Sequence, residues 1–412
     1  MFKNPTSHVQ QGMTLIELMV AMVLGLVTTL IVAQVMVNAE GQRRTTTSGT
    51  DAQINGASGL YLLSRDLQAA GYGLIGKSTM RGCPIRWANG NTAITDFRLL
   101  PVSMTVDAAG NAVIRILSSG STDFAVPVAV QEGLQPATLA ATGFKVRSTL
   151  GMAPGHLMVV APPAWDPADN TTWCTLFPAG TISTATTLPV NGISATPVSD
   201  EQKAEFGGFG PEVFPAAGYP LESTVVNLGT VPDLREYRVA NNTLQMRRLL
   251  TTGAWGDWQT MAPGVVRMVA LYGVDDTVPA DGRVDRYTTT SPANADGWSR
   301  VLTMRVAVVA RSAQFERPIT EPVSNTVTRV TTAAPRWLLG HRSIPVEGAT
   351  PCSVTKNEDE EDVESDQACM SLSVGATPAD GTPTPPDQDW RNYRYKIFDT
   401  VVPLRNQVWS PL

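Results

Sequence analysis

The stretch GMTLIELMVAMVLGLVTTLIVAQVMV, residues 12–37, determines how this chain of 412 residues is organised. Its segment Leu18–Val37 is almost wholly apolar, interrupted only by two threonines and one glutamine. Twenty helical residues span about 30 Å, which is the thickness of the hydrocarbon core of a bilayer. Glu17 stands directly before this run, and a carboxylate so close to hydrocarbon is costly enough to indicate a function.

Two general interpretations of this segment are open. A secretory signal peptide would explain Val37-Asn38-Ala39 as a cleavage site and Lys3 as the basic region, but the apolar run exceeds the usual length of about 7–15 residues. A simple single-pass anchor would explain Glu17, because the stretch that begins at Thr14 fits a capping box at the positive end of the helix dipole. The anchor does not explain the polar leader that ends at Gly12.

A third interpretation rests on a resemblance. GMTLIELMVA resembles the processing site of type IV prepilins and type II secretion pseudopilins, in which a polar leader ends in Gly before an apolar residue, Thr-Leu, an aliphatic residue and Glu. The resemblance implies that a prepilin peptidase cuts between Gly12 and Met13 and that the new amine of Met13 is methylated. The family usually has Phe where Met13 stands. Glu17 becomes the fifth residue of the mature chain.

Glu17 is then the natural counter-charge of the Met13 amine. Within one helix the two groups are about 6 Å apart along the axis. When helices stack with an axial offset, the amine of an incoming helix can reach the Glu17 carboxylate of its neighbour. Pairing in an apolar environment removes a cost that each charge carries alone. We therefore expect Glu17 to fix the register in which these helices assemble.

The helix is expected to continue through residues 38–72, where Gly71 supplies a stop. Glycines between Gly41 and Gly59 weaken it by up to about 1 kcal/mol each, so we expect bending or partial melting there. Its second half is amphipathic and is predicted to pack on a globular head. The apolar residues at helical spacing are Ile54, Leu60, Leu63 and Leu67.

Beyond about residue 80 the sequence has the pattern of short strands and turns. REYRVANNTLQMRRL, residues 235–249, predicts a hairpin that turns at Asn241-Asn242, because Asn tolerates positive φ. Residues 265–275 and 299–312 predict core strands. Two regions rich in Pro, Gly and Thr predict insertions or irregular loops: about 150–222 and 345–390.

Several later segments resemble the PilW family of minor pilins, which is related to the type II secretion pseudopilin GspJ. They are LLSRDLQAAGY (62–72), VVNLG (225–229), YGVD (272–275), DGRVD (281–285) and YRYKIFDTVVPLRNQVW (393–409). The resemblance implies a pilin-like α+β fold, with a long N-terminal helix on a β-rich head of antiparallel sheets. The predicted parts are a leader (1–12), a transmembrane assembly helix (13–37), its amphipathic continuation (38–72) and a periplasmic head (73–412).

The resemblance also implies a function. A protein of this family takes part in initiating type IV pilus assembly, in a minor-pilin complex at the filament tip, and so supports motility or adhesion. Its implied partners are other minor pilins, the major pilin and prepilin peptidase, and the inner membrane holds the helix before assembly moves it to the pilus. Two alternatives stay open: a GspJ-like minor pseudopilin of type II secretion, and a pilus-tip adhesin.

The four cysteines have no CxxC spacing, so zinc-ribbon and thioredoxin-like chemistry have no support. An even number of cysteines in a chain with an export-type N-terminus favours disulfides. Of the three connectivities, proximity favours Cys83–Cys174 with Cys352–Cys369. Four buried free thiols are the alternative.

Catalysis and nucleic-acid binding have little support. Only His156 and His341 lie beyond the leader, neither has a neighbouring His or Cys at metal-ligand spacing, and the chain has no nucleophile elbow, P-loop or Rossmann fingerprint. The net charge of −6 comes without a dense basic cluster apart from Arg43-Arg44. We expect no enzymatic activity, no cofactor and no nucleic-acid partner.

Two groups of carboxylates are weak candidates for Ca²⁺, which prefers oxygen ligands. The run EDEEDVESD (358–366) lacks the spacing of an EF-hand, and a solvated loop is the simpler interpretation. A second group surrounds an Asp-Gly turn and consists of Asp275, Asp276, Asp281 and Asp285. Arg65, Asp66 and Arg405 are candidates for structural ion pairs with the head.

Overall fold

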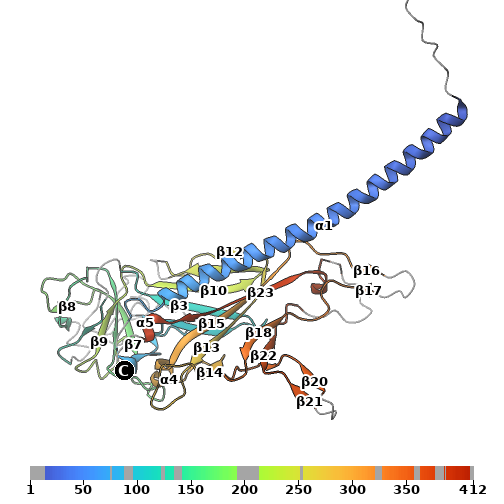
Figure 1. The fold of residues 1–412 in the computed structure, drawn as a ribbon. Coiled ribbons are helices and arrows are strands. Elements are labelled where there is room, and N and C mark those ends of the chain that lie inside the picture. The colour runs from blue at the N-terminus through green and yellow to red at the C-terminus, as the bar shows by residue number, and fades with distance from the viewer. Residues whose placement is uncertain are drawn as a thin grey trace, which may run out of the picture. The chain divides into compact units, whose positions relative to one another are not determined.

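The structure is a computed structural model that describes eleven segments of the chain (Figure 1). They are residues 14–74, 77–87, 96–121, 126–133, 142–192, 213–250, 254–320, 327–356, 362–375, 385 and 387–408. The chain divides into two compact units, one up to Asp51 and one from Ala52 onward, and each is described by itself. The cleavage-site residues Gly12 and Met13 lie outside the described residues.

One helix, α1 (Leu15–Ala69), begins in the first unit and ends in the second. Among the described residues, Leu15–Val37 is a stretch of 23 residues that is long and apolar enough to cross a membrane, and its side chains are exposed. The Thr29 hydroxyl donates to the Gly25 carbonyl at 2.7 Å, and Thr28 donates in the same way to Leu24. The polar atoms of both threonines are thus satisfied within the helix.

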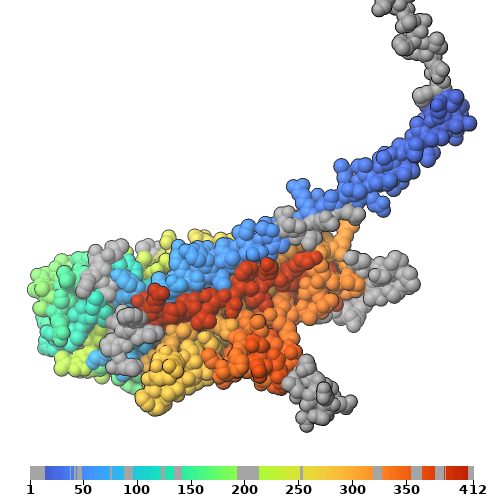
Figure 2. All heavy atoms as spheres, viewed as in Figure 1, coloured from blue at the N-terminus to red at the C-terminus, as the bar shows by residue number. Residues whose placement is uncertain are grey.

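Bending or partial melting was expected between Gly41 and Gly59, and the melting is wrong, because α1 is helical throughout. In the second unit, packing at Gly56 and Gly59 supports the helix. A Cβ on Gly59 would lie 2.9 Å from the Ala262 Cβ, and a Cβ on Gly56 would meet the ring of Phe398. Figure 2 shows this part of α1, in blue, running beside the red C-terminal strand. Glycine lets the helix approach the sheets closely, which offsets its poor helix propensity.

The helix ends where the sequence predicts. Gly71 has φ of +79°, and its N–H donates to the Leu117 carbonyl at 2.8 Å. The Asn406 side-chain amide donates to the Ala70 carbonyl at 2.9 Å. The Ser118 hydroxyl likewise donates to the Ala69 carbonyl at 3.1 Å, so two segments of the head supply donors for carbonyl groups that the last turn of a helix leaves unpaired.

The described part of the head forms three large sheets and four small ones. The first has the order β12-β11-β10-β3-β2: Gln259–Pro263, Thr243–Arg248, Asp233–Ala240, Ala112–Ser118 and Val102–Val106. The second has the order β14-β13-β15-β23: Arg286–Thr288, Val265–Val274, Val301–Arg311 and Tyr395–Pro403. The third has the order β1-β7-β6-β9-β4: Ile85–Trp87, Cys174–Pro178, Leu157–Ala161, Thr224–Asn227 and Val128–Ala129.

The small sheets complete the head. One has the order β18-β22-β19: Arg336–His341, Gln367–Ser371 and Thr350–Pro351. The other three are strand pairs: β5-β8 (Phe144–Lys145, Thr187–Leu188), β16-β17 (Ile319–Thr320, Val327–Thr328) and β20-β21 (Val354–Lys356, Asp362–Glu364). Short helical segments are η1 (Ser78–Met80), α4 (Ala295–Ser299), η3 (Trp390–Asn392) and α5 (Arg405–Val408).

The first two sheets share one hydrophobic core with the helix. Strand β12 passes through Gly264, at φ of +75°, directly into β13 of the second sheet. Leu63 and Leu67 of α1 are fully buried in this core together with Tyr237 of the first sheet and Val306 of the second. The predicted fold class is confirmed: an apolar N-terminal helix and a β-rich α+β head whose sheets are antiparallel except for the parallel pair β1–β7.

Local sequence patterns predicted the central strands. Strands β10 and β11 form the predicted hairpin, and Asn241 and Asn242 both have positive φ, at 51° and 56°. Strands β13 and β15 lie within the two predicted core segments. The irregular structure expected for about 150–222 is wrong in its described part, which supplies β6 and β7 of the third sheet. Its Pro and Gly residues are turns between short strands.

Both cysteine pairs that proximity favours are disulfide-bonded. Cys83 joins the segment before β1 to Cys174 at the start of β7, with their Cα atoms 5.9 Å apart. Cys352 joins Cys369 of β22, with their Cα atoms 4.9 Å apart. The described part of the segment between these two cysteines is not irregular, because it contains the strand pair β20–β21 and the first residues of β22. The expectation of irregular structure for 345–390 is therefore also wrong in this part.

The close approach at Gly59 can be tested by substitution. Gly59→Leu should lower the free energy of unfolding of the head by about 1–3 kcal/mol, because the side chain has no space beside Ala262 and Leu244. Denaturant unfolding of the detergent-solubilised protein, followed by tryptophan fluorescence, measures this. Gly49→Leu is the matched control, since a Cβ there meets nothing within 4 Å. Equal stability of the two variants would contradict the packing argument.

Candidate functional site

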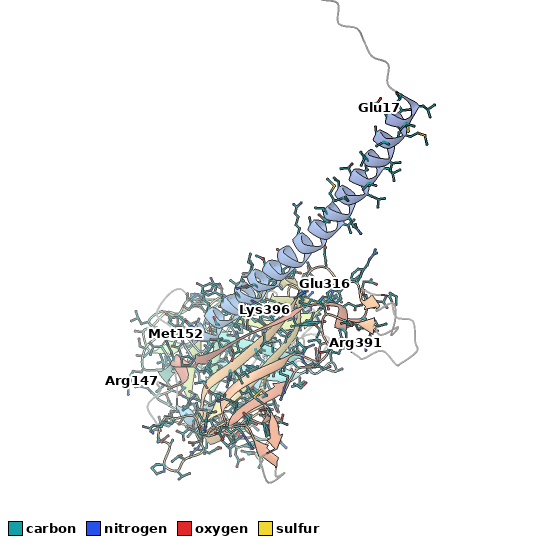
Figure 3. The ribbon with its side chains drawn as sticks, turned by 45° about the vertical axis from the view of Figure 1, so that its right-hand side comes forward. Glu17, Arg147, Met152, Glu316, Arg391 and Lys396 are labelled. Carbon is teal, nitrogen blue, oxygen red and sulfur yellow. A yellow bond between two sulfur atoms is a disulfide. The ribbon has the colours of Figure 1, made fainter. Side chains whose placement is uncertain are left out.

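Glu17 lies in the first turn of α1 and makes the capping box that the sequence predicts (Figure 3). The Thr14 N–H donates to the Glu17 Oε2 at 3.0 Å, and the Thr14 hydroxyl donates to the same oxygen at 3.2 Å. The Glu17 N–H in turn donates to the Thr14 hydroxyl oxygen at 3.3 Å. The Glu17 carboxylate is thus held beside the backbone of Thr14, the second residue after the predicted cleavage point.

This geometry leaves Glu17 able to bind another group. Both donors from Thr14 go to Oε2, and a carboxylate has about four acceptor positions on its two oxygens. Glu17 is exposed, and its neighbours Leu15, Ile16, Leu18 and Met19 are exposed apolar side chains. A cation that approaches along this surface meets a positioned anion in an apolar environment, where a charge pair is stronger than in water.

At the other end of the helix, Asp66 anchors α1 to the head. Its side chain is only 7% exposed and lies between two groups of β10. The Arg235 Nη1 and the Tyr237 hydroxyl each donate to the Asp66 Oδ2 at 2.5 Å. Arg235 also pairs with Asp233 at 2.9 Å. The ion pair expected between Asp66 and the head is therefore confirmed, and we name Asp66, Arg235 and Tyr237 the helix anchor.

The surroundings of the helix anchor keep Tyr237 and Arg235 in the protonated forms that donate hydrogen bonds. Burial raises the pKa of the Tyr237 phenol, and its hydrogen bond to Asp66 raises it further, so the hydroxyl stays a donor. Burial alone would lower the pKa of Arg235, but hydrogen bonds to Asp233 and Asp66 raise it overall. Arg65 contacts Asp66 on the same helix at 3.5 Å. Within the described part of the chain, Arg405 makes no ion pair, contrary to expectation.

The helix anchor is a feature that sequence patterns did not reveal. Arg235 and Tyr237 are about 170 positions from Asp66 along the chain, so no local spacing connects them. One signal was available: Asp66 lies between Leu63 and Leu67 on the apolar stripe of the helix. A carboxylate on a buried stripe requires a partner.

The carboxylates around the Asp-Gly turn are used by the turn itself. Asp275 accepts a hydrogen bond from the Gly282 N–H at 2.8 Å, and Asp285 accepts from the Thr277 N–H and hydroxyl, each at 2.9 Å. The hydrogen bonds from Thr277 hold the pKa of Asp285 below its usual value. Asp281 accepts from the Arg283 N–H at 3.0 Å. These contacts agree with the simpler interpretation of an Asp-Gly turn.

No group of three or more His, Cys, Asp or Glu side chains able to hold a metal occurs among the residues that the structure describes. In the acidic run 358–366, residues up to 361 lie outside that part, and Glu364 pairs with Arg342 at 2.5 Å. The absence of a cofactor therefore stays a prediction.

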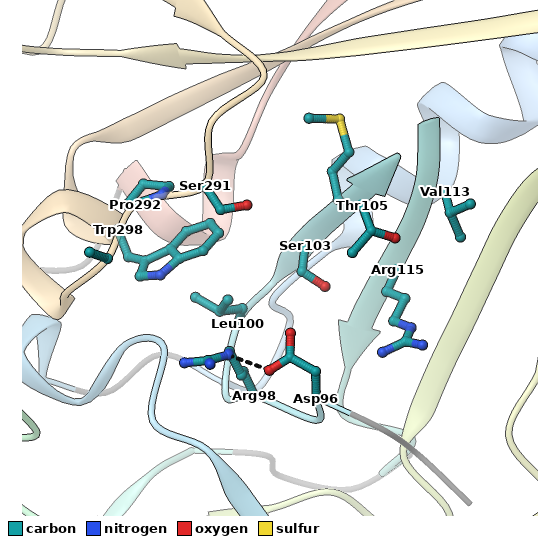
Figure 4. A pocket seen from close by; sticks show the side chains of 12 residues that line it. Asp96, Arg98, Leu100, Ser103, Thr105, Val113, Arg115, Ser291, Pro292 and Trp298 are labelled. Atoms are coloured by element: carbon teal, nitrogen blue, oxygen red, sulfur yellow. Dashed lines mark hydrogen bonds and ion pairs between the residues drawn. The ribbon is translucent and has the colours of Figure 1, made fainter. Parts of the chain in front are cut away.

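The first sheet borders a cavity of about 210 Å³ beside its edge strand β2 (Figure 4). Its wall combines Ser103 and Thr105 of β2 with Trp298 of α4. Three charged residues also line it, and two of them, Asp96 and Arg98, bind each other at 2.7 Å. The structure shows no hydrogen bond between a hydroxyl and a carboxylate among these lining residues, and the absence of enzymatic activity stays a prediction.

Comparisons with known families agree with the geometry at both ends of the helix. Residues 7–33, which contain Glu17, match the prokaryotic N-terminal methylation motif. Residues 233–343, which contain Arg235 and Tyr237, match the family model of the type IV pilus-assembly protein W, PilW. Searches of curated proteins and of solved structures found no match.

The resemblance to PilW and to the methylated N-terminus is thus confirmed. The two matches support a type IV pilin-like role in pilus assembly, association with pilus components and processing by prepilin peptidase. The apolar helix together with the pilin motif is consistent with membrane anchoring and with a place in the pilus.

Removing the carboxylate of the helix anchor should loosen the helix from the head. Asp66→Ala should lower the free energy of unfolding by about 2–3 kcal/mol, because it leaves Arg235 partly buried without this partner. Tyr237→Phe should cost about 1.5–3 kcal/mol, the value of one hydrogen bond to a charged group. Denaturant unfolding measures both, with the exposed Asp257→Ala as the control expected within about 0.5 kcal/mol of the unchanged protein. An Asp66→Ala variant as stable as this control would show that the anchor does not hold the helix.

Proposed function

We propose that this protein is a minor pilin that takes part in initiating type IV pilus assembly, within a minor-pilin complex at the tip of the filament. It acts by non-covalent association and not by catalysis. The observation that carries the proposal is the positioned Glu17 carboxylate at the start of an exposed apolar helix, directly after a processing motif.

Cleavage after Gly12 would create a positive amine at Met13, one residue before the capping box. That amine is methylated in our proposal and keeps its charge. In a single subunit, helix geometry would separate it from its own Glu17 by about 6 Å along the axis. In a filament, the amine of the next subunit reaches the remaining acceptor positions of Glu17. Apolar packing supplies the affinity, and the charge pair selects the axial register.

The surroundings of the helix change during this process. Before assembly, the 23-residue apolar segment Leu15–Val37 is buried in the inner membrane as a single-pass anchor. After assembly, the same side chains are buried by the helices of other minor pilins and of the major pilin. The two disulfides support a periplasmic location of the head, because disulfides persist in oxidising compartments.

The filament is a pilus in this proposal, and not the pseudopilus of type II secretion. The same helix chemistry would serve both, so Glu17 does not separate them. The match of residues 233–343 to the pilus-assembly protein W supports the pilus. Motility or adhesion that depends on the pilus would be lost when assembly is not initiated.

Neutralising Glu17 tests the proposal. Glu17→Gln keeps the shape of the side chain and its capping contact but removes the negative charge. We expect the variant to enter the membrane and to be cleaved after Gly12, while its amount in purified filaments falls about tenfold, the equivalent of about 1.4 kcal/mol. Immunoblots of sheared pili give the amount, and mass spectrometry gives the N-terminus.

The control is Glu40→Gln, which removes a carboxylate from the same helix beyond its apolar segment and should leave incorporation unchanged. Normal incorporation of Glu17→Gln would disprove the register role. A mature N-terminus other than methylated Met13 would disprove the assignment as a pilin.

A further inference from the structure

Arginine and tryptophan side chains alternate along the first sheet on the face opposite α1. The Arg238 guanidinium stacks on the Trp258 ring at 3.7 Å, and the Arg247 guanidinium contacts the same ring at 4.4 Å. Arg247 also lies 4.5 Å from the Trp255 ring, which Arg115 approaches at 6.0 Å. We name this series the Arg/Trp ladder; its members are Arg238, Trp258, Arg247, Trp255 and Arg115.

The strand register places the ladder on the outer face. Glu236 of β10 lies opposite Arg247 of β11 and Arg115 of β3, so these three side chains share one face. The residues that alternate with them, Tyr237 and Ile114, point into the core that α1 covers. The ladder is therefore on the side of the sheet away from the helix anchor.

The centre of the ladder is fixed by a buried carboxylate. Glu236 is 4% exposed, and it accepts from the Arg115 Nε and the Arg247 Nη2, each at 2.5 Å. The two arginine side chains are 22% and 24% exposed. A guanidinium held both by a carboxylate and by an indole ring has little rotamer freedom left to lose when it binds a further group.

Two arginines of the ladder, Arg238 and Arg247, have N–H groups that no described residue accepts. Arg238 donates its Nε to Gln245 at 3.1 Å, and its two terminal amino groups have no hydrogen-bond partner among the described residues. Arg247 uses Nε and Nη2 on Glu236, so the structure shows no partner for its Nη1 within the described segments. Three arginines and one glutamate give this face a charge of about +2, in a chain whose net charge is −6.

Two features favour a protein partner over nucleic acid. Trp258 lies between Arg238 and Arg247, so this indole is already stacked and offers no platform for a base. Arginine and tryptophan are the residues enriched at the hot spots of protein interfaces, and guanidinium groups bind carboxylates with two parallel hydrogen bonds.

We propose that the Arg/Trp ladder is a docking surface for a carboxylate-bearing surface of another subunit of the filament. This inference rests on the proposed function, because it names the chemistry of the partner that the head meets at the filament tip. The carboxylates bind Arg238 and the outward N–H groups of Arg247, and apolar atoms of the partner cover the edges of the two indoles.

Site-specific photocrosslinking in pilus-forming cells tests the proposal with the full-length protein. A benzophenone amino acid replaces Thr260, an exposed residue of β12 that pairs with Gln245 on the ladder face. The same replacement at Leu150, which is 70% exposed in the loop after β5, is the control. The expected result is a crosslink from position 260, and not from 150, to a filament subunit within a segment that contains at least two carboxylates.

Charge reversal then tests the pairing. Arg238→Glu should lower the yield of that crosslink and the amount of the protein in filaments by about tenfold. Replacing the mapped carboxylates of the partner by Arg should restore both. Arg238→Gln, which keeps hydrogen bonding and loses the charge, should give an intermediate loss, and unfolding curves of all variants should coincide.

The outcomes separate this inference from the proposed function. If the unchanged protein is absent from filaments, the proposed function fails. If it is present and position 260 crosslinks no more than position 150, or crosslinks to nucleic acid or polysaccharide, the docking surface is overturned and the proposed function stands. If Arg238→Glu lowers incorporation and charge reversal in the partner does not restore it, the docking surface is also overturned. The ladder would then serve only to stabilise the sheet.

Discussion

The apolar side chains of the 23-residue segment Leu15–Val37 are exposed, and in water such a surface is unstable. A bilayer can bury it, and so can the helices of other subunits. Both environments are apolar, so moving from one to the other costs little hydrophobic energy. In our proposal, a directional interaction therefore distinguishes the helix in the filament from the helix in the bilayer. Glu17 is the charged side chain within this segment that can make such an interaction.

The second half of the helix is constrained in the opposite way. Leu63 and Leu67 are fully buried between two sheets, and Gly59 lets the helix approach to a distance that any other residue would prevent. Packing alone would allow a helix to slide or rotate along an apolar groove. Asp66 removes this freedom, because its carboxylate meets Arg235 and Tyr237 in only one position. In our proposal a charge thus specifies position at both ends of α1, Asp66 within the head and Glu17 in the filament, while apolar contacts supply the binding energy.

Local chemistry made much of this predictable from the sequence. The capping box at Glu17, the stop at Gly71 and the turn at Asn241-Asn242 each depend on residues within a few positions of one another, and each is present. The partial melting predicted from the helix glycines was wrong, because helix propensity describes an isolated helix and not one that packs on a sheet. The helix anchor and the Arg/Trp ladder could not be predicted from the sequence for another reason. Their members meet only after strands that are distant in the sequence pair in a particular register.

Because its members are distant in the sequence, the Arg/Trp ladder exists only in the folded head and is not a sequence motif. Its five side chains come from β3, β10, β11 and the segment that leads into β12, and they meet around one buried glutamate. The direct ion pairs of Glu236 are to Arg115 and Arg247, whereas Arg238 stacks on Trp258, whose ring face attracts a guanidinium. The charge of Glu236 also acts on Arg238, but no described carboxylate is in hydrogen-bond contact with it. A guanidinium held in this way on the outside of an acidic protein is most simply explained by an anion on the molecule that it meets.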